Sequence, residues 1–179
     1  MLEAFLDVLR FHIDRGVRTL RLDAVAFLWK EPGTPSIHLR QTHEIVRLIR
    51  LLLDFEELPV ILITETNVPH EENISYFGNG RDEAQMVYNF TLPPLLFYTF
   101  VKEDATALTE WAKGLHLDSA SNTFFNFTAS HDGIGVRPLE GILPPGELTA
   151  LIDIVTANGG RVSYKQNPDG TESPYELNI

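Results

Sequence analysis

Three acidic residues, Asp23, Glu65 and Asp132, each follow a short apolar run of the kind that forms a buried strand. If these strands are parallel, their carboxyl ends meet at one edge of the sheet and the three carboxylates converge on one crevice. Like charges held together favour protonation of one of them, which supplies an acid beside a base. A nucleophilic carboxylate and a carboxylic acid are what cleavage of a glycosidic bond with retention requires.

Each acid taken singly has an ordinary structural explanation, because a strand-terminal Asp or Glu is commonly a helix N-cap or a solvated loop residue. Three of them together, each followed by a long loop, favour a functional site. Arg21 lies two residues before Asp23, so the two side chains project from the same face of the expected strand. An arginine there holds the carboxylate ionised and oriented, as a nucleophile needs. A purely structural ion pair fits this spacing equally well.

The elements that position these residues follow from the hydrophobic pattern. We expect helices at 2–16, 43–54 and 147–157, strands at 17–22, 60–64, 85–90 and 123–129, a helical stretch from about 93 to 115, and a polar tail at the end. Strands separated by helical crossovers pair in parallel, which predicts an α/β fold. An open doubly wound sheet and a (β/α) barrel both satisfy the alternation, and the glycine-rich fingerprints of nucleotide-binding sheets are missing from the sequence.

Composition narrows the possible partners. The 179 residues include no cysteine, 44% are hydrophobic and the net charge is -11, which describes a globular domain without disulfides. The negative charge disfavours nucleic acid and membrane surfaces as partners.

Acidic residues within the first helix argue against a signal peptide or membrane span, so we expect a cytoplasmic protein. His38, His43 and His70 lack metal-ligand spacing, and we expect no metal site.

The segments that contain these acids resemble a known family. Arg21-Leu22-Asp23-Ala24-Val25 resembles the fourth-strand motif of the α-amylase superfamily, glycoside hydrolase family 13, Thr64-Glu65 resembles its fifth-strand acid, and Phe127 through His131-Asp132 resembles its seventh-strand motif. The longer stretches RLDAVAFLWKEPGT, ITETNVPHEENISYFG and NFTASHDGIGVRP are similar to the sucrose phosphorylase branch, and particularly to its glucosylglycerate phosphorylase and sucrose 6'-phosphate phosphorylase members.

This resemblance implies a role for each candidate residue. Asp23 would be the nucleophile, Glu65 the general acid and then base, and Asp132 the carboxylate that stabilises the transition state. The substrate-binding residues would be Arg21, which steadies Asp23, His131, which binds the glucosyl unit, and Phe27, which lines the acceptor side. The implied reaction is retaining transfer of an α-glucosyl group from a sucrose-like glucoside to inorganic phosphate, giving α-glucose 1-phosphate through a β-glucosyl-enzyme intermediate, with no cofactor.

The resemblance also implies a partial TIM (β/α)8 barrel. A full barrel has eight strands in roughly 250 residues, so residues 1–179 are expected to be a catalytic barrel domain truncated at both ends, with strands four to seven. Exposed edge strands would favour association or homo-oligomers, and we expect little turnover from the fragment alone. Two alternatives stay open: an α-glucoside hydrolase or transglucosylase of the same superfamily, and a non-catalytic fragment that binds carbohydrate or a complementary half barrel.

Overall fold

A computed structural model of the chain describes residues 2–144, 146–167 and 169–179. These residues form two compact units. The parallel unit comprises residues 2–66, 71–88 and 117–125, and the antiparallel unit comprises residues 67–70, 89–116 and the described part of 126–179. Each unit has its own sheet and its own hydrophobic core.

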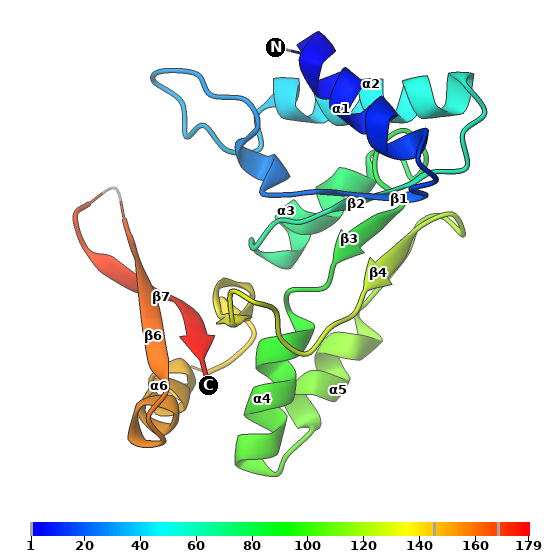
Figure 1. The fold of residues 1–179 in the computed structure, drawn as a ribbon. Coiled ribbons are helices and arrows are strands. Elements are labelled where there is room, and N and C mark those ends of the chain that lie inside the picture. The colour runs from blue at the N-terminus through cyan, green and yellow to red at the C-terminus, as the bar shows by residue number, and fades with distance from the viewer. Residues whose placement is uncertain (1, 145, 168) are drawn as a thin grey trace. The chain divides into compact units, whose positions relative to one another are not determined.

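Four parallel strands form the sheet of the parallel unit, in the order β1-β2-β3-β4 (Figure 1). They are β1 (Thr19–Leu22), β2 (Ile61–Thr64), β3 (Met86–Tyr88) and β4 (Thr123–Phe125). Helix α1 (Leu2–Ile13) precedes β1, and the 3-10 turn η1 (Val25–Phe27) and helix α2 (Arg40–Phe55) connect β1 to β2. Between β2 and β3 lie α3 (His70–Ile74) and the 3-10 turn η2 (Ser75–Phe77). The predicted α/β class is confirmed.

Helices α1 and α2 cover one face of this sheet (Figure 1). Both helices are amphipathic, and their apolar sides share one core with the inward-facing residues of β1 and β2. This core includes Leu6, Leu9, Ile13, Leu20, Leu22, Val46, Ile49, Leu53 and Leu62. Each fully buried aliphatic side chain stabilises such a core by about 1.5–3 kcal/mol, so the helices fix the strands firmly.

The strand register determines which residues are level at the carboxyl edge of the sheet. Leu22 on β1 pairs with Thr64 on β2, and Thr64 pairs with Val87 on β3. The chain leaves β1 and β2 immediately after this paired row, at Asp23 and Glu65. These two residues therefore lie side by side where the strands end.

In its described residues, the antiparallel unit contains three helices and a three-stranded sheet in the order β5-β7-β6. The helices are α4 (Leu92–Lys102), α5 (Thr106–Lys113) and α6 (Glu147–Ala157). The strands are β5 (Ile134–Gly135), β6 (Arg161–Gln166) and β7 (Glu172–Asn178), and the 3-10 turn η3 (Arg137–Leu139) follows β5. The core of this unit includes Leu95, Ile134, Leu151, Val155 and Leu177.

Two sequence predictions for the antiparallel unit are wrong. The segment after α6, which was predicted to be a polar tail, contains strands β6 and β7, which pair with each other. The single helical stretch predicted to reach Leu115 is two helices, because Glu103 adopts a left-handed conformation with φ 54° and ends α4. Asp104 then accepts hydrogen bonds from the hydroxyl and the backbone N–H of Thr106, which lower the pKa of its carboxyl, and a new helix begins.

Candidate active site

Asp23 and Glu65 share one guanidinium at the carboxyl edge of the parallel unit. Arg21 Nη1 donates a hydrogen bond to Asp23 Oδ1 at 2.5 Å, and Arg21 Nη2 lies 3.9 Å from Glu65 Oε2. Strand β1 alternates exposed and buried residues, so Arg21 and Asp23 project from the face opposite to Leu20 and Leu22. The structure brings these three candidate residues together.

Arg21 keeps its positive charge at this position. Partial burial disfavours the charge, but the hydrogen bond to Asp23 and the neighbouring Tyr88, Asp23 and Glu65 outweigh burial and raise the pKa of the guanidinium. The guanidinium carbon also lies 5.3 Å from the centre of the Tyr88 ring, within reach of a cation–π contact. A permanent cation lowers the electrostatic cost of placing two carboxylates side by side.

The backbone after Asp23 helps to hold Glu65. The N–H of Ala24 donates to Glu65 Oε2 at 2.8 Å, and the N–H of Val25 donates to the carbonyl oxygen of Glu65 at 3.3 Å. Ala24 adopts φ 45° and ψ 35°, a left-handed conformation that costs a residue with a Cβ about 1 kcal/mol or more. The two hydrogen bonds from Ala24 and Val25 to Glu65 offset this cost, and they fix the carboxylates of Asp23 and Glu65 relative to each other.

The two carboxyl groups lie in different surroundings. The side chain of Asp23 is 71% exposed, whereas that of Glu65 is 14% exposed. An exposed carboxylate is accessible to an incoming electrophilic carbon, and a shielded carboxyl group is suited to exchange a proton with a bound substrate. Two carboxyl groups in different environments are the arrangement from which an acid and a nucleophile are built.

Phe27, the residue predicted to line the acceptor side, ends the 3-10 turn η1 that follows Asp23 and Ala24. Phe27 is 43% exposed, and the ammonium nitrogen of Lys30 lies 5.0 Å from the centre of its ring. The turn therefore presents an aromatic surface and a cation four and seven residues after Asp23 in the chain. The function of this surface stays a prediction.

His131 and Asp132 belong to the antiparallel unit, where they occupy the two central positions of a tight turn. Ser130 and Gly133 exchange backbone hydrogen bonds of 3.0 and 3.2 Å around them. Gly133 has φ 97°, and a Cβ there would lie 2.5 Å from the carbonyl oxygen of Leu177, so the turn requires glycine. His131 Nε2 lies 3.3 Å from Asp132 Oδ2. The convergence of Asp132 with Asp23 and Glu65 stays a prediction.

Tyr88 is a residue at the carboxyl edge that the sequence reasoning does not single out. It ends β3, pairs with Phe125 on β4, and its ring centre lies 4.7 Å from that of Phe125. Aromatic rings beside carboxylates are suited to contact the apolar face of a sugar. The sequence carried no signal for this place, because the expected strand at 85–90 continues past Tyr88, whereas β3 ends at it.

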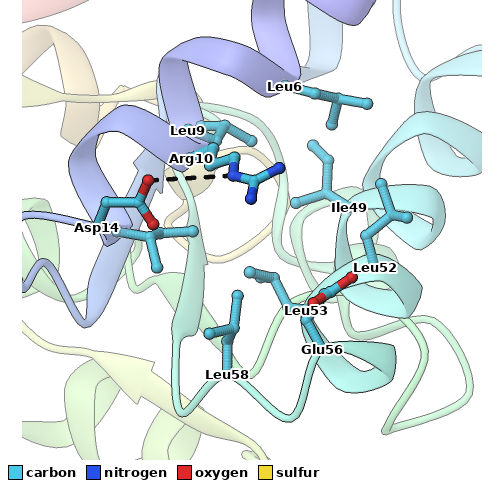
Figure 2. A pocket seen from close by; sticks show the side chains of 10 residues that line it. Leu6, Leu9, Arg10, Asp14, Ile49, Leu52, Leu53, Glu56 and Leu58 are labelled. Carbon is cyan, nitrogen blue, oxygen red and sulfur yellow. Dashed lines mark ion pairs between the residues drawn. The ribbon is translucent and has the colours of Figure 1, made fainter.

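An apolar pocket of about 260 Å³ lies between α1 and α2 and is lined by residues such as Leu6, Leu9, Ile49 and Leu52 (Figure 2). Arg10 Nε lies 4.0 Å from Asp14 Oδ2 beside it. The lining residues Ile13 and Leu58 precede β1 and β2, so this pocket is at the amino-terminal end of the strands. It is therefore separate from the edge that carries Asp23, where parallel α/β proteins build their active sites.

Within the described ranges, no group of three or more histidine or acidic side chains is arranged to hold a metal ion. Likewise, no helix in the part of the chain that the structure describes is long and apolar enough to cross a membrane. His38 and His43 instead make contacts to Tyr76 and to buried or half-exposed glutamates.

Comparison with known proteins gives close relatives but no matching family model. Over its entire length the chain is 51% identical to the glucosylglycerate phosphorylase of Escherichia coli (strain K12), of which it covers 32%. It is 55% identical, over 96% of its length, to the glucosylglycerate phosphorylase of Allomeiothermus silvanus, of which it covers 31%. The chain thus spans about a third of the length of these curated relatives.

A solved structure identifies the architecture. The crystal structure of sucrose 6F-phosphate phosphorylase from Thermoanaerobacter thermosaccharolyticum matches 96% of the chain with a TM-score of 0.78 at 23% identity, and the chain covers 34% of it. At this identity the likeness shows the fold, so the four parallel strands with their alternating helices are part of a TIM barrel. The predicted resemblance to the sucrose phosphorylase branch of glycoside hydrolase family 13 is thereby confirmed, for a chain that corresponds to about a third of such an enzyme.

Proposed function

We propose that the protein carrying this chain is a retaining α-glucosyl phosphorylase that transfers the glucosyl group of glucosylglycerate, or of a similar α-glucoside, to inorganic phosphate. The observation that carries the proposal is the cluster at the end of β1 and β2, in which Arg21 contacts Asp23 and reaches Glu65. The names of the relatives that are 51% and 55% identical to the chain support glucosylglycerate as the donor.

In the first step, the carboxylate of Asp23 attacks the anomeric carbon of the donor. Glu65 gives its proton to the glycosidic oxygen, the bond between that oxygen and the anomeric carbon breaks, and the aglycone leaves. The product is a β-glucosyl ester on Asp23. Arg21 orients the attacking group through its 2.5 Å hydrogen bond to Asp23 Oδ1, which favours a single geometry for the attack.

In the second step, an oxygen of phosphate attacks the anomeric carbon of this ester from the opposite side. The ester bond breaks, Asp23 regains its charge, and Glu65 accepts the proton of the attacking phosphate hydroxyl. Two inversions give net retention, so the product is α-glucose 1-phosphate. The guanidinium of Arg21 stabilises the carboxylate that Asp23 becomes on departure.

The remaining candidate residues bind the sugar and the acceptor in this proposal. Asp132 binds hydroxyl groups of the glucosyl unit and stabilises the positively charged transition state, and His131 hydrogen-bonds the same unit. Phe27 lines the acceptor side, where its exposed ring can contact the aglycone. The family resemblance of the motifs supports these three roles.

The test uses the full-length protein that carries this chain, incubated with glucosylglycerate and inorganic phosphate. We expect phosphate-dependent formation of glucose 1-phosphate, with the α configuration of the first product seen by proton NMR. Release of free glucose at a rate independent of phosphate would instead assign a hydrolase, and transfer to added sugars without phosphate consumption a transglucosylase. Sugar binding without turnover would assign a carbohydrate-binding protein.

A further inference from the structure

We propose that Lys30 binds the anionic group of the acceptor, an oxyanion that belongs either to inorganic phosphate or to a carboxylated aglycone such as glycerate. The inference rests on the proposed function, because it names the residue that recognises the acceptor of that reaction. It starts from a charge requirement at the carboxyl edge and from the contacts of the segment that follows Asp23.

The charge requirement arises because an anionic acceptor must approach two carboxyl groups. Arg21 is already engaged by both Asp23 and Glu65, at 2.5 and 3.9 Å. The positive charge of Arg21 offsets the negative charge of only one of the two carboxylates. An oxyanion that approaches the carboxylates is therefore repelled unless a further cation lies beside the oxyanion. The segment immediately after Asp23 contains one such cation, Lys30.

Lys30 is available for this task. Its ammonium lies over the exposed ring of Phe27, 5.0 Å from the ring centre, and within the described residues no carboxylate lies at ion-pair distance from it. The adjacent acid, Glu31, accepts a hydrogen bond from Gln41 Nε2 at 3.4 Å instead. Lys30 is exposed, and because an ammonium has three N–H donors, its contact with one ring leaves donors that an anion can reach.

The segment that carries Lys30 is anchored at both of its ends. The N–H of Trp29 donates to Thr42 Oγ1 on α2 at 3.3 Å, and Thr42 is fully buried. The N–H of His38 donates to the carbonyl oxygen of Ala26 in η1 at 3.0 Å. These two hydrogen bonds fix the turn with Phe27 and Lys30 to the body of the parallel unit.

His38 is itself held through both ring nitrogens. Its Nδ1 lies 2.9 Å from the hydroxyl of Tyr76, and its Nε2 lies 3.1 Å from Glu72 Oε2. Tyr76 is fully buried and stacks on His43, with ring centres 4.6 Å apart. A segment held in this way needs little further ordering when an acceptor binds, which favours affinity for it.

The experiment compares Lys30→Met with Lys30→Arg in the full-length protein. Methionine keeps the apolar stem and removes the charge, and arginine keeps the charge. The matched control is Lys113→Met, which removes the charge of an exposed lysine on α5 that pairs with Glu110 at 2.7 Å. The wild-type protein must first form α-glucose 1-phosphate, and if it does not, the proposed function fails irrespective of the variants.

The first arm uses α-glucosyl fluoride, a donor that carries neither a carboxylate nor a phosphate, and measures the KM for phosphate and, without phosphate, the rate of hydrolysis of the same donor. We expect Lys30→Met to raise this KM about tenfold or more, because a hydrogen bond to a charged group is lost. Hydrolysis uses neutral water and should stay within about twofold of wild type, and in Lys113→Met both the KM for phosphate and the hydrolysis rate should stay within this range. Lys30→Arg should stay nearer to wild type than Lys30→Met.

The second arm separates the two sources of the oxyanion. It uses α-glucosyl fluoride as donor, without phosphate, and compares glycerate with uncharged glycerol as acceptor. A loss confined to phosphate or to glycerate, with glycerol and water unaffected, supports the proposal and says which anion Lys30 binds. Unchanged KM values for both anions, or an equal loss with glycerol and water, would overturn it.

Discussion

The two units hold their candidate residues by different means. In the parallel unit, Asp23 and Glu65 are placed by the pairing of two strands and are fixed further by Arg21 and by the backbone N–H of Ala24. In the antiparallel unit, His131 and Asp132 lie on a tight turn that one glycine permits, and their side chains are 78% and 53% exposed. Substitutions in the first unit should therefore act on the chemistry directly or through buried polar contacts. In the second unit, substitution of Gly133 should act through the backbone of the turn that carries His131 and Asp132.

The largest expected effect comes from Asp23→Asn. This change removes the nucleophile but leaves an exposed side chain of nearly the same size, so kcat/KM for phosphorolysis should fall by about 10⁴-fold with little change in stability. The measurement is the initial rate of α-glucose 1-phosphate formation by the full-length protein. Asp7→Asn, on the exposed surface of α1, is the control and should keep its activity. A loss of less than tenfold would contradict the assignment of Asp23.

The next effect tests the buried polar contacts of the parallel unit. Glu83 is fully buried, with His43 Nδ1 at 2.9 Å and Arg47 Nη2 at 2.8 Å from its carboxylate. Glu83→Ala removes the buried carboxylate that contacts His43 and forms an ion pair with Arg47, and should lower the free energy of unfolding by about 3 kcal/mol. Urea denaturation measures the change. Glu56→Ala, at an exposed position after α2, should change it by less than about 0.5 kcal/mol, and equal effects would show that the buried contacts are dispensable.

A smaller effect tests the turn of the antiparallel unit. Gly133→Ala places a Cβ 2.5 Å from the carbonyl oxygen of Leu177 at a positive φ, and should lower the free energy of unfolding by about 2 kcal/mol. Gly141→Ala is the matched control, because Gly141 has φ 78° but its Cβ would meet nothing within 4 Å. Its cost should be about 1 kcal/mol, from the backbone conformation alone. The same urea denaturation measures both variants, and identical losses would mean that the close approach to Leu177 is relieved by a small shift.

The smallest expected effect is a change in how the free energy of unfolding depends on pH. Burial, with further contributions from Glu83 and Glu72, raises the pKa of Tyr76 well above its ordinary value. Above pH 10 the unfolded state therefore loses a proton that the folded state keeps, and the free energy of unfolding falls by about 1.4 kcal/mol per pH unit from this group. Tyr76→Phe should flatten this fall between pH 10 and 11 in urea denaturation. A slope equal to wild type would show that other groups cause it.

The strands of the parallel unit were predictable from sequence because each is a short apolar run that ends at a polar residue. Helix α6 was also predicted with the bounds that it has, Glu147–Ala157. The structure places Arg21, Asp23 and Glu65 in contact or near contact, while their catalytic roles stay predictions. Tyr88 was missed because its relevance depends on the order of the strands, which hydrophobic pattern alone does not give.

The hairpin of β6 and β7 was missed because most of its residues are half exposed, so apolar and polar positions do not alternate clearly. The Asp169-Gly170 dipeptide was the available signal, since such pairs are typical of hairpin turns. There the N–H of Asn167 donates to the carbonyl oxygen of Thr171 at 2.8 Å and closes the loop. Whether Asp132 meets the other two acids depends on long-range packing that local patterns do not encode.

The pairing of Leu22 with Thr64 has a consequence for engineering. One residue inserted in β1 before Arg21 would move every later side chain of the strand to the opposite face of the sheet. Arg21 would then point toward the helices. Between Lys30 and Ser36 the chain has no partner strand, so loop length can vary there without disturbing the sheet. Libraries that seek new acceptors should therefore lengthen or shorten this loop and leave the strand intact.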